Sequence, residues 1–213
     1  MSFIESLKFF KRRILWKVFL FKNQLPQELK QGDWSLGIDD FEVIFKKIRS
    51  LKNRDRITLV ELGAGVSTII LACFMAKLNM KYSIVSFEGD SSWVERVEEW
   101  VNRYHLNKEI NLYHIPYEQY ADCIWFKKDR IKEIINGQSI DILLVDAPPG
   151  VLCPVSRKSA IPFFLPWLHN DSTVFLHDTK RKDELDIIQA WDTYFNSKTT
   201  YTLRGITAFR HRH

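Results

Sequence analysis

The chain has 213 residues, 46% of them hydrophobic and 27% charged, which fits a globular domain with a substantial buried core. Its three cysteines, Cys73, Cys123 and Cys153, form no Cys-x-x-Cys motif and no cluster with histidine, so we expect neither a disulfide framework nor structural zinc, and favour the reducing cytoplasm. The net charge of +5 comes from residues 1–30, where seven Lys and Arg residues face two Glu residues, so the neutral body lacks the basic groove of a nucleic-acid-binding protein.

Residues 1–30 are predicted to form a basic amphipathic extension, and residues 31–213 the main domain. Apolar residues of the extension recur every three or four positions, the spacing of one helix face: Phe3, Leu7, Phe10, Ile14, Val18 and Phe21. Its apolar runs are far shorter than the roughly 20 residues that span a bilayer. Two interpretations stay open: the apolar face packs on the body or a second subunit, or residues 3–22 lie on an anionic membrane surface.

From residue 38 onward, apolar strands alternate with amphipathic helices. This alternation predicts an α/β fold with a Rossmann-like, doubly wound, mostly parallel sheet, closed by an antiparallel C-terminal hairpin that turns at Gly205. We predict strands at 57–61, 82–88, 109–115, 140–146 and 172–178, and helices at 38–51, 67–78, 91–104, 126–136, 158–168 and 182–195.

Such sheets bind ligands beyond the carboxyl ends of their strands, and the first strand of this sequence ends in Glu61-Leu-Gly63-Ala-Gly65-Val-Ser67-Thr68. Gly63 and Gly65 permit a ligand to approach the backbone closely, and Ser67 and Thr68 can cap the following helix. A dinucleotide fingerprint requires a third glycine where Thr68 stands. Glu61 would repel a pyrophosphate but suits a ligand that carries an ammonium group.

Later strand ends add carboxylates and an imidazole. Glu88 ends the second strand, about where a carboxylate accepts hydrogen bonds from ribose hydroxyls. Asp146 ends the fourth strand before a Pro-Pro-Gly turn, and His177 and Asp178 end the fifth. Because these strands are neighbours, the three side chains are expected to lie together, where they could hold a divalent cation or orient a hydroxyl group and accept its proton.

Together these blocks resemble the class I S-adenosylmethionine-dependent methyltransferases, and within them a bacterial O-methyltransferase-like group. The blocks are "VELGAGVST", "SFEGDSSWVERV", "IDILLVDAPPG" with "SRKSAIPFFLPWL", and "VFLHDTKRKDE". The group has Asp-Gly-Pro-Pro-Gly where this chain has Asp-Ala-Pro-Pro-Gly. The resemblance covers about residues 34–213. It implies the seven-stranded methyltransferase fold, S-adenosylmethionine as cofactor, and methyl transfer to a hydroxyl oxygen of a small molecule or glycan.

The resemblance also implies a role for each strand end. The glycine loop surrounds the methionine end of the cofactor, Glu88 binds its ribose, and Asp146 lies near the sulfonium and the acceptor. The implied cofactor-binding residues are Glu61, Gly63, Gly65, Ser67, Thr68, Glu88 and Asp146.

In related metal-dependent catechol-type enzymes, residues at the positions of Asp146, Asp178 and Thr179 bind magnesium, so the resemblance raises Mg²⁺ as a second cofactor. Two departures weaken that implication: Thr179 replaces an Asn of the catechol type, and His177 replaces the first Asp of the bacterial group's Asp-Asp pair.

Transfer to a sugar-type hydroxyl requires removal of its proton. His177 is the candidate base because the pKa of imidazole suits the task, and Asp146 is the alternative base. Arg157 and Arg181 stand in loops at the same end and are candidates to bind an anionic acceptor.

The expected partner is a small-molecule or glycan acceptor rather than nucleic acid, and the expected location is the cytoplasm or the inner face of its membrane. Three alternatives stay open. A nucleic-acid methyltransferase is disfavoured because Asp146 is followed by Ala147 and no aromatic residue ends the turn. A catalytically inactive binding module would keep the fold, and a nicotinamide-dependent oxidoreductase is disfavoured by Glu61 and Thr68.

Overall fold

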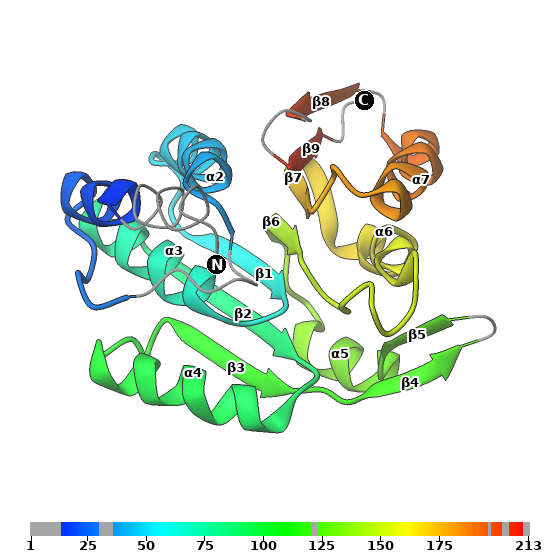
Figure 1. Cartoon of the computed structure of the whole chain (residues 1–213), viewed down its shortest axis with the longest axis horizontal. Helices are drawn as coiled ribbons and strands as arrows, with labels where there is room; N and C mark the ends of the chain where they lie inside the picture. The colour runs from blue at the N-terminus through cyan, green and yellow to red at the C-terminus, as the bar shows by residue number, and fades with distance from the viewer. Residues whose placement is uncertain (1–13, 30–35, 121–122, 196, 202–204, 211–213) are drawn as a thin grey trace, which may run out of the picture.

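The structure is a computed structural model of the chain, and it describes residues 14–29, 36–120, 123–195, 197–201 and 205–210. Its centre is one seven-stranded sheet in the order β3-β2-β1-β6-β7-β9-β8 (Figure 1). The strands of this sheet are β1 (Ile57–Leu62), β2 (Tyr82–Glu88), β3 (Ile110–His114), β6 (Ile140–Val145), β7 (Leu168–His177), β8 (Ser197–Tyr201) and β9 (Ile206–Arg210).

Strands β3, β2, β1, β6 and β7 pair in parallel, whereas β9 lies antiparallel between β7 and β8. Gly205 directly precedes β9, and its φ of +78° lies in the left-handed region that favours glycine. The predicted doubly wound sheet with a closing antiparallel hairpin is therefore confirmed.

Helices cover both faces of the sheet (Figure 1). Because helices cover both faces of the sheet, the side chains of a central strand point alternately into two separate hydrophobic cores. Leu59 of β1 belongs to the first core, and its neighbour Val60 belongs to the second. The first core takes α2 (Ile38–Ser50), α3 (Val66–Lys77) and α4 (Ser91–Arg103), and the second takes α5 (Lys128–Ile135), α6 (Ala160–Phe164) and α7 (Lys182–Trp191).

Residues 14–22 form a helix that packs on α2. Phe19 stacks on Phe41 and Phe45, with ring centroids 5.7 and 5.8 Å apart, and Trp16 donates a hydrogen bond of 2.8 Å to the carbonyl of Leu29. The face that packs is not the predicted apolar stripe. Of that stripe, Ile14, Val18 and Phe21 are exposed, and Phe3, Leu7 and Phe10 lie outside the described residues.

Two regions differ from the sequence expectations. A two-stranded antiparallel sheet, β4 (Tyr117–Tyr120) and β5 (Cys123–Phe126), occupies a stretch for which no element was predicted. The helix predicted at 158–168 is divided into the 3₁₀ turn Ser156–Ser159, α6 and the 3₁₀ turn Leu165–Trp167. Pro166 accounts for the second division, because proline lacks the N–H that would continue the α-helix.

The expectation of no disulfide is wrong. Cys123, at the start of β5, is bonded to Cys153 in the loop that follows β6, across 30 positions of sequence. The β4–β5 hairpin brings the two cysteines together. Because this hairpin was not predicted, the positions of the cysteines in the sequence did not indicate that they would pair. The third cysteine, Cys73 on α3, is free.

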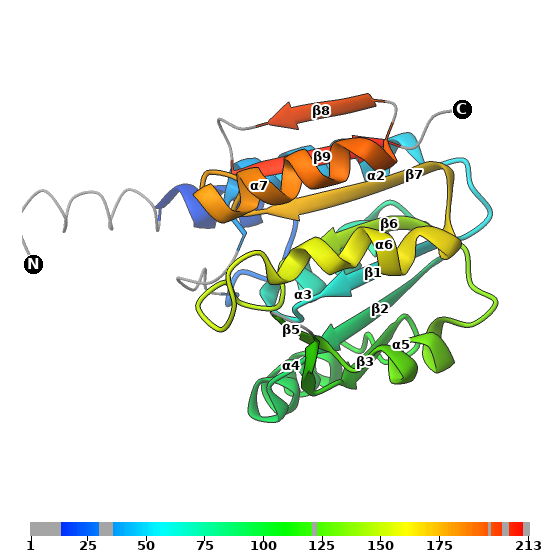
Figure 2. The same cartoon turned by 90° about the vertical axis from the view of Figure 1, so that its right-hand side faces the viewer.

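The carboxyl ends of β1, β2, β6 and β7 all point to the same edge of the sheet, as the arrows in Figure 2 show. We call this the carboxyl edge. In the described part of the chain, no helix combines the length and the apolar character that crossing a membrane requires.

Candidate active site

Glu61, near the end of β1, is fully buried behind the loop that joins β1 to α3. One of its carboxylate oxygens accepts a hydrogen bond of 2.5 Å from Ser67, and the other accepts bonds of 2.5 Å from Thr68 and 2.6 Å from Ser86. Burial raises the pKa of Glu61 to about 7, and the three hydroxyl groups limit that rise. Glu61 therefore orders the loop from within and presents no exposed surface of its own to a ligand.

The loop itself needs glycine at its first turn. Gly63 has a φ of +97°, and a Cβ atom there would lie 3.1 Å from the Cβ of Ala147, just beyond the end of β6. Gly65 directly precedes α3, and its N–H donates a hydrogen bond of 2.9 Å to the hydroxyl of Thr68. Thr68 thus links the start of α3 both to Gly65 and to buried Glu61.

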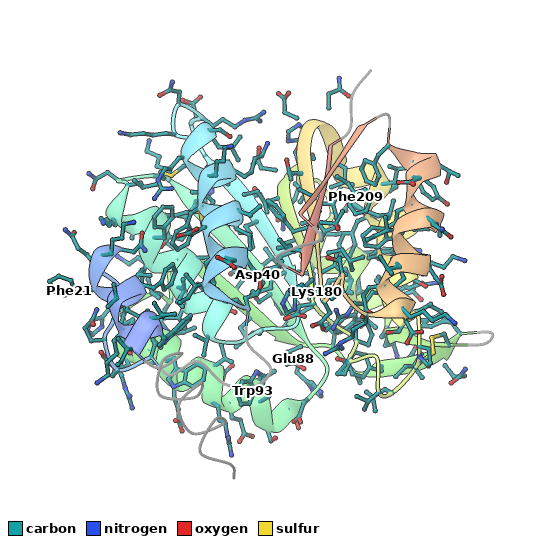
Figure 3. All side chains as sticks on the ribbon, turned by 45° about the horizontal axis from the view of Figure 1, so that its top comes forward. Phe21, Asp40, Glu88, Trp93, Lys180 and Phe209 are labelled. Atoms are coloured by element: carbon teal, nitrogen blue, oxygen red, sulfur yellow. A yellow bond between two sulfur atoms is a disulfide. The ribbon has the colours of Figure 1, made fainter. Side chains whose placement is uncertain are left out.

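Glu88 ends β2 beside this loop. Its Oε1 accepts hydrogen bonds of 2.7 Å from the N–H of Gly89 and 3.0 Å from the N–H of Asp90. Burial raises the pKa of Glu88, and these amides oppose the rise. Trp93 of α4 donates a hydrogen bond of 2.7 Å to the carbonyl of Ala64, and Figure 3 shows Glu88 and Trp93 close to each other. This hydrogen bond therefore fixes the loop after β1 against α4, the helix that follows β2.

Asp146 directly follows β6, and His177 is the last residue of β7, the neighbouring strand. The structure brings the two side chains together, as predicted. The imidazole Nδ1 lies 2.8 Å from Oδ1 of Asp146 and 3.7 Å from Oδ1 of Asp178. The imidazole Nε2 lies 3.5 Å from Oδ2 of Asp40, a buried residue of α2. His177 is thus enclosed by three carboxylates.

This arrangement fixes the charge of the imidazole. Burial alone would lower the pKa of His177, but Asp146 first, and then Asp40 and Asp178, outweigh burial and raise that pKa well above its usual value. Burial likewise acts to raise the pKa of Asp146, yet His177 and Arg157 hold it below its usual range. At neutral pH the pair is therefore an imidazolium bonded to a carboxylate.

Arg157 is a buried cation in the same cluster, with only 4% of its side chain exposed. Its guanidinium nitrogens lie 3.4 Å from Asp146, 3.2 Å from Asp178 and 3.5 Å from Glu184. It also donates hydrogen bonds of 3.2 Å to the carbonyls of Pro148 and His177. Arg157 was predicted to bind substrate, but its guanidinium group is already occupied by contacts within the protein.

Arg181 is placed differently. About half of its side chain is exposed, and one guanidinium nitrogen lies 3.0 Å from Oδ2 of Asp178. It directly precedes α7 at the carboxyl edge and has free surface toward solvent. Of the two predicted arginines, Arg181 is the one whose position suits contact with an acceptor.

The residues predicted to hold magnesium do not fit a divalent cation. Asp146 and Asp178 do come together, and with His177 they form a group whose ligand atoms lie within 4.8 Å of one another. However, the guanidinium of Arg157 already bridges these two carboxylates, and a second positive charge at the same oxygens would be repelled. The hydroxyl of Thr179 is buried and has no hydrogen-bond partner among the described residues.

Sequence reasoning missed two carboxylates of the cluster, Asp40 and Glu184. Both are less than 5% exposed. Asp40 lies on α2, far before the strand ends in sequence, whereas Glu184 lies on α7, the helix that follows β7. A signal was present, because each occupies the apolar face of its helix: Asp40 stands four positions before Ile44, and Glu184 stands four positions before Ile188. A carboxylate in such a position is costly to bury unless a partner is nearby.

A hollow elsewhere on the molecule has no link to this cluster. It is lined by Lys81, Tyr82 and His105 among others, near the start of β2 and away from the carboxyl edge. None of the predicted site residues lines it.

Comparison with known proteins agrees with the fold. A family model described as a methyltransferase domain matches residues 60–179. None of the curated protein sequences compared with the chain matches it significantly.

Solved structures give further fold matches. A Staphylococcus aureus protein assigned as a caffeoyl-CoA O-methyltransferase has a TM-score of 0.60 at 14% identity, over 99% of this chain and 93% of that one. The O-methyltransferase from Bacillus cereus, in complex with SAH, has a TM-score of 0.55 at 13% identity, over 91% and 89% of the two chains. TomG from Streptomyces achromogenes, an O-methyltransferase in complex with SAM, has a TM-score of 0.55 at 12% identity, over 94% and 90%.

At such identities these likenesses establish the fold and not the substrate. The family match spans more than half of the chain and includes the glycine loop, Glu88, Asp146 and His177. The chain therefore belongs to the methyltransferase domain family and has its Rossmann-like fold.

Proposed function

We propose that the protein is an S-adenosylmethionine-dependent O-methyltransferase that modifies a hydroxyl group of a small molecule or glycan. The observation that carries this proposal is the hydrogen-bonded pair of Asp146 and His177 beside the glycine loop. A Cβ atom on Gly63 would lie 3.5 Å from the carbonyl carbon of Asp146, so the loop and the pair adjoin. Solved neighbours described as O-methyltransferases support oxygen as the methylated atom.

The residues of the carboxyl edge fit the proposed cofactor. Gly63 lets the loop pack closely on Ala147, and a Cβ atom at Gly65 would have, among the described residues beyond its chain neighbours, only Nε1 of Trp93 within 4 Å. The N-terminus of α3 follows the loop, and Glu88 carries a carboxylate already oriented by two amides. Such a carboxylate is suited to accept hydrogen bonds from ribose hydroxyls. Ser67, Thr68 and Glu61 would keep the loop in shape. Bound S-adenosylmethionine would supply a methyl group activated by a positively charged sulfur.

Asp146 is the base that we propose. His177 holds a proton at neutral pH, so it could accept another only after losing the first, whereas the carboxylate of Asp146 is ionised. A carboxylate is a weak base, but a hydroxyl oxygen becomes strongly acidic as it gains a methyl group, so a weak base is sufficient. His177 would keep Asp146 ionised and oriented through the bond at Oδ1, and Asp40 would hold the other side of the imidazole.

This proposal requires no magnesium. Arg157 and His177 already supply positive charge to Asp146 and Asp178 at distances between 2.8 and 3.7 Å. An anionic acceptor would find Arg181 at the rim of the same cluster. Orientation of the acceptor by these fixed charges would account for much of the rate, since alignment is the main requirement of methyl transfer.

The test is transfer of a labelled methyl group. Purified protein is incubated with S-adenosylmethionine labelled in its methyl carbon and with fractionated cell extract, and the labelled products are separated and treated with mild base. The proposal predicts a labelled ether that survives base and is absent with Asp146→Asn. Label found on nucleic acid, or on nitrogen, would contradict the O-methyltransferase assignment. Binding of the cofactor without any labelled product would favour the inactive binding module.

A further inference from the structure

The helix formed by residues 14–22 has two apolar faces, and only one of them is used within the described structure. Trp16, Phe19 and Leu20 are no more than 5% exposed and belong to the first core, and the rings of Trp16 and Phe19 contact Phe41 of α2. The opposite side chains, Ile14, Leu15, Val18 and Phe21, are 47%, 48%, 56% and 77% exposed. We call these four residues the exposed stripe.

The stripe is a concentrated feature of the surface. Eight large apolar side chains are exposed among the described residues, and four of them are in this one helix. Figure 3 shows Phe21 at the periphery of the molecule, pointing away from the body. Contiguous exposed apolar side chains of this kind mark sites of interaction with a partner or a membrane.

Charge indicates which partner covers the stripe. Lys17 and Lys22 are exposed on the same helix, and the sequence of residues 1–30 carries seven basic residues against two acidic ones. A symmetric contact between two copies would bring these like-charged segments together, which is unfavourable. An anionic lipid surface offers the opposite charge together with an apolar layer for the stripe.

We propose that the helix at residues 14–22 binds in the plane of an anionic lipid surface through Ile14, Leu15, Val18 and Phe21. Trp16, Phe19 and Leu20 keep the helix attached to the body, so lipid binding would immobilise the whole domain rather than a free tail. This proposal does not depend on the reaction that the domain catalyses.

The orientation that follows is favourable for an acceptor delivered by the membrane. The N-terminal helix lies at the same edge toward which the sheet strands point, and so does the loop after β6 (Figure 2). That loop carries Val151 and Leu152, which are 74% and 54% exposed. Both apolar surfaces therefore belong to the edge that carries the candidate active site.

The test is co-sedimentation of the full-length protein with vesicles of phosphatidylcholine alone or mixed equally with phosphatidylglycerol. The proposal predicts binding to the anionic vesicles that weakens at least tenfold in Val18→Ser/Phe21→Ser, because these side chains lose the apolar burial that drives insertion. It also predicts that Lys17→Glu/Lys22→Glu weakens binding, and that salt weakens binding of the wild type.

Leu185→Ser is the matched control, since Leu185 is 45% exposed on α7 and lies outside the stripe. Its binding should equal that of the wild type. All three variants alter exposed positions, and circular dichroism checks that they are folded. Equal binding to both vesicle types, or anionic binding unaffected by Val18→Ser/Phe21→Ser, would overturn the proposal. A dimer in sedimentation velocity that this double variant abolishes would also overturn it, in favour of a second copy as the occupant.

Discussion

Nδ1 of His177 lies 2.8 Å from Oδ1 of Asp146, and the two residues extend neighbouring parallel strands of the central sheet. Each strand supplies one half of the pair, so the pair exists only in the folded chain. Asp40 from α2 and Arg157 from the 3₁₀ turn Ser156–Ser159 then balance the charges of the pair. The chemistry proposed for the protein depends on which member of the pair carries the proton.

The pH dependence of the reaction distinguishes the two candidate bases. The carboxylates around His177 raise its pKa well above the usual value, and the pKa of Asp146 is lowered. If Asp146 is the base, kcat/KM should not rise between pH 6 and pH 9, since Asp146 is ionised throughout. If His177 is the base, kcat/KM should rise about tenfold for each pH unit below its folded pKa. A flat profile therefore supports Asp146, and a rising one contradicts that assignment.

Replacement of the base should reduce the rate without loss of cofactor binding. Asp146→Asn is expected to lower kcat by roughly 10²- to 10⁴-fold, the usual contribution of a positioned general base. Asp178→Asn is the matched control, because Asp178 contacts Arg157 and Arg181 but is not the proposed base. Steady-state kinetics should give a much smaller loss for the control. Equal losses in the two variants would mean that Asp146 acts only as part of the charge cluster.

The ribose assignment of Glu88 predicts a binding defect. Glu88→Gln removes a charged acceptor, and hydrogen bonds to charged groups contribute about 1.5–3 kcal/mol, which corresponds to a roughly 10- to 150-fold weaker affinity. Isothermal titration with S-adenosylhomocysteine measures it. Asp90→Asn is the control, since Asp90 caps α4 two positions away and is expected to leave the affinity unchanged. An unchanged affinity in Glu88→Gln would remove Glu88 from the site.

Glu61 should make the stability of the protein dependent on pH. Burial raises its pKa from 4.5 to about 7, so the folded state binds a proton that the unfolded state has released between these values. The stabilisation is fully present below pH 4.5 and is lost as pH rises to about 7, with a total change of about 3 kcal/mol.

Glu61→Gln should remove this slope, because glutamine does not titrate. Urea denaturation of both proteins between pH 5 and pH 8 measures the difference. We expect the free energy of unfolding of the wild type to fall relative to that of the variant as pH increases. Parallel curves would show that Glu61 does not change its protonation state on folding.

Arg157 is expected to supply the positive charge that a metal ion would otherwise bring to Asp146 and Asp178. Activity should change by less than twofold when EDTA is added, because Arg157 and His177 already neutralise Asp146 and Asp178. Arg157→Met should destabilise the fold by about 3–5 kcal/mol, since it leaves buried carboxylates without their partner. Loss of activity in EDTA that added Mg²⁺ restores would contradict this account.

Much of the sheet was predictable because its strands are short, apolar and separated by amphipathic helices. The same regularity placed Glu61, Glu88, Asp146 and His177 at one edge of the predicted sheet. The β4–β5 hairpin was not predicted, because its sequence carries neither an Asn-Gly nor an Asp-Gly turn between alternating residues. The Cys123–Cys153 disulfide depends on that hairpin and was missed with it.

The charge balance of the site was the least predictable part. Asp40 comes from α2, far before His177 in the sequence, and Glu184 comes from α7, which follows β7. Tertiary packing brings Asp40 to His177 and Glu184 to Arg157. Those contacts keep His177 protonated. The sequence alone favoured His177 as the base, because it does not show the carboxylates that surround the imidazole. The N-terminal helix shows the same limit, because it has two apolar faces and periodicity identified the one that does not pack.

The central claim, that the carboxyl edge binds a methyl donor, is tested most directly by calorimetric titration of the full-length protein with S-adenosylmethionine, S-adenosylhomocysteine and NAD⁺. The account predicts that the first two bind with one site per chain and that NAD⁺ gives no heat. At a concentration of 100 times its Kd, S-adenosylmethionine or S-adenosylhomocysteine should also raise the free energy of unfolding by about 2.7 kcal/mol. Binding of NAD⁺ alone, or of none of the three, would contradict the account.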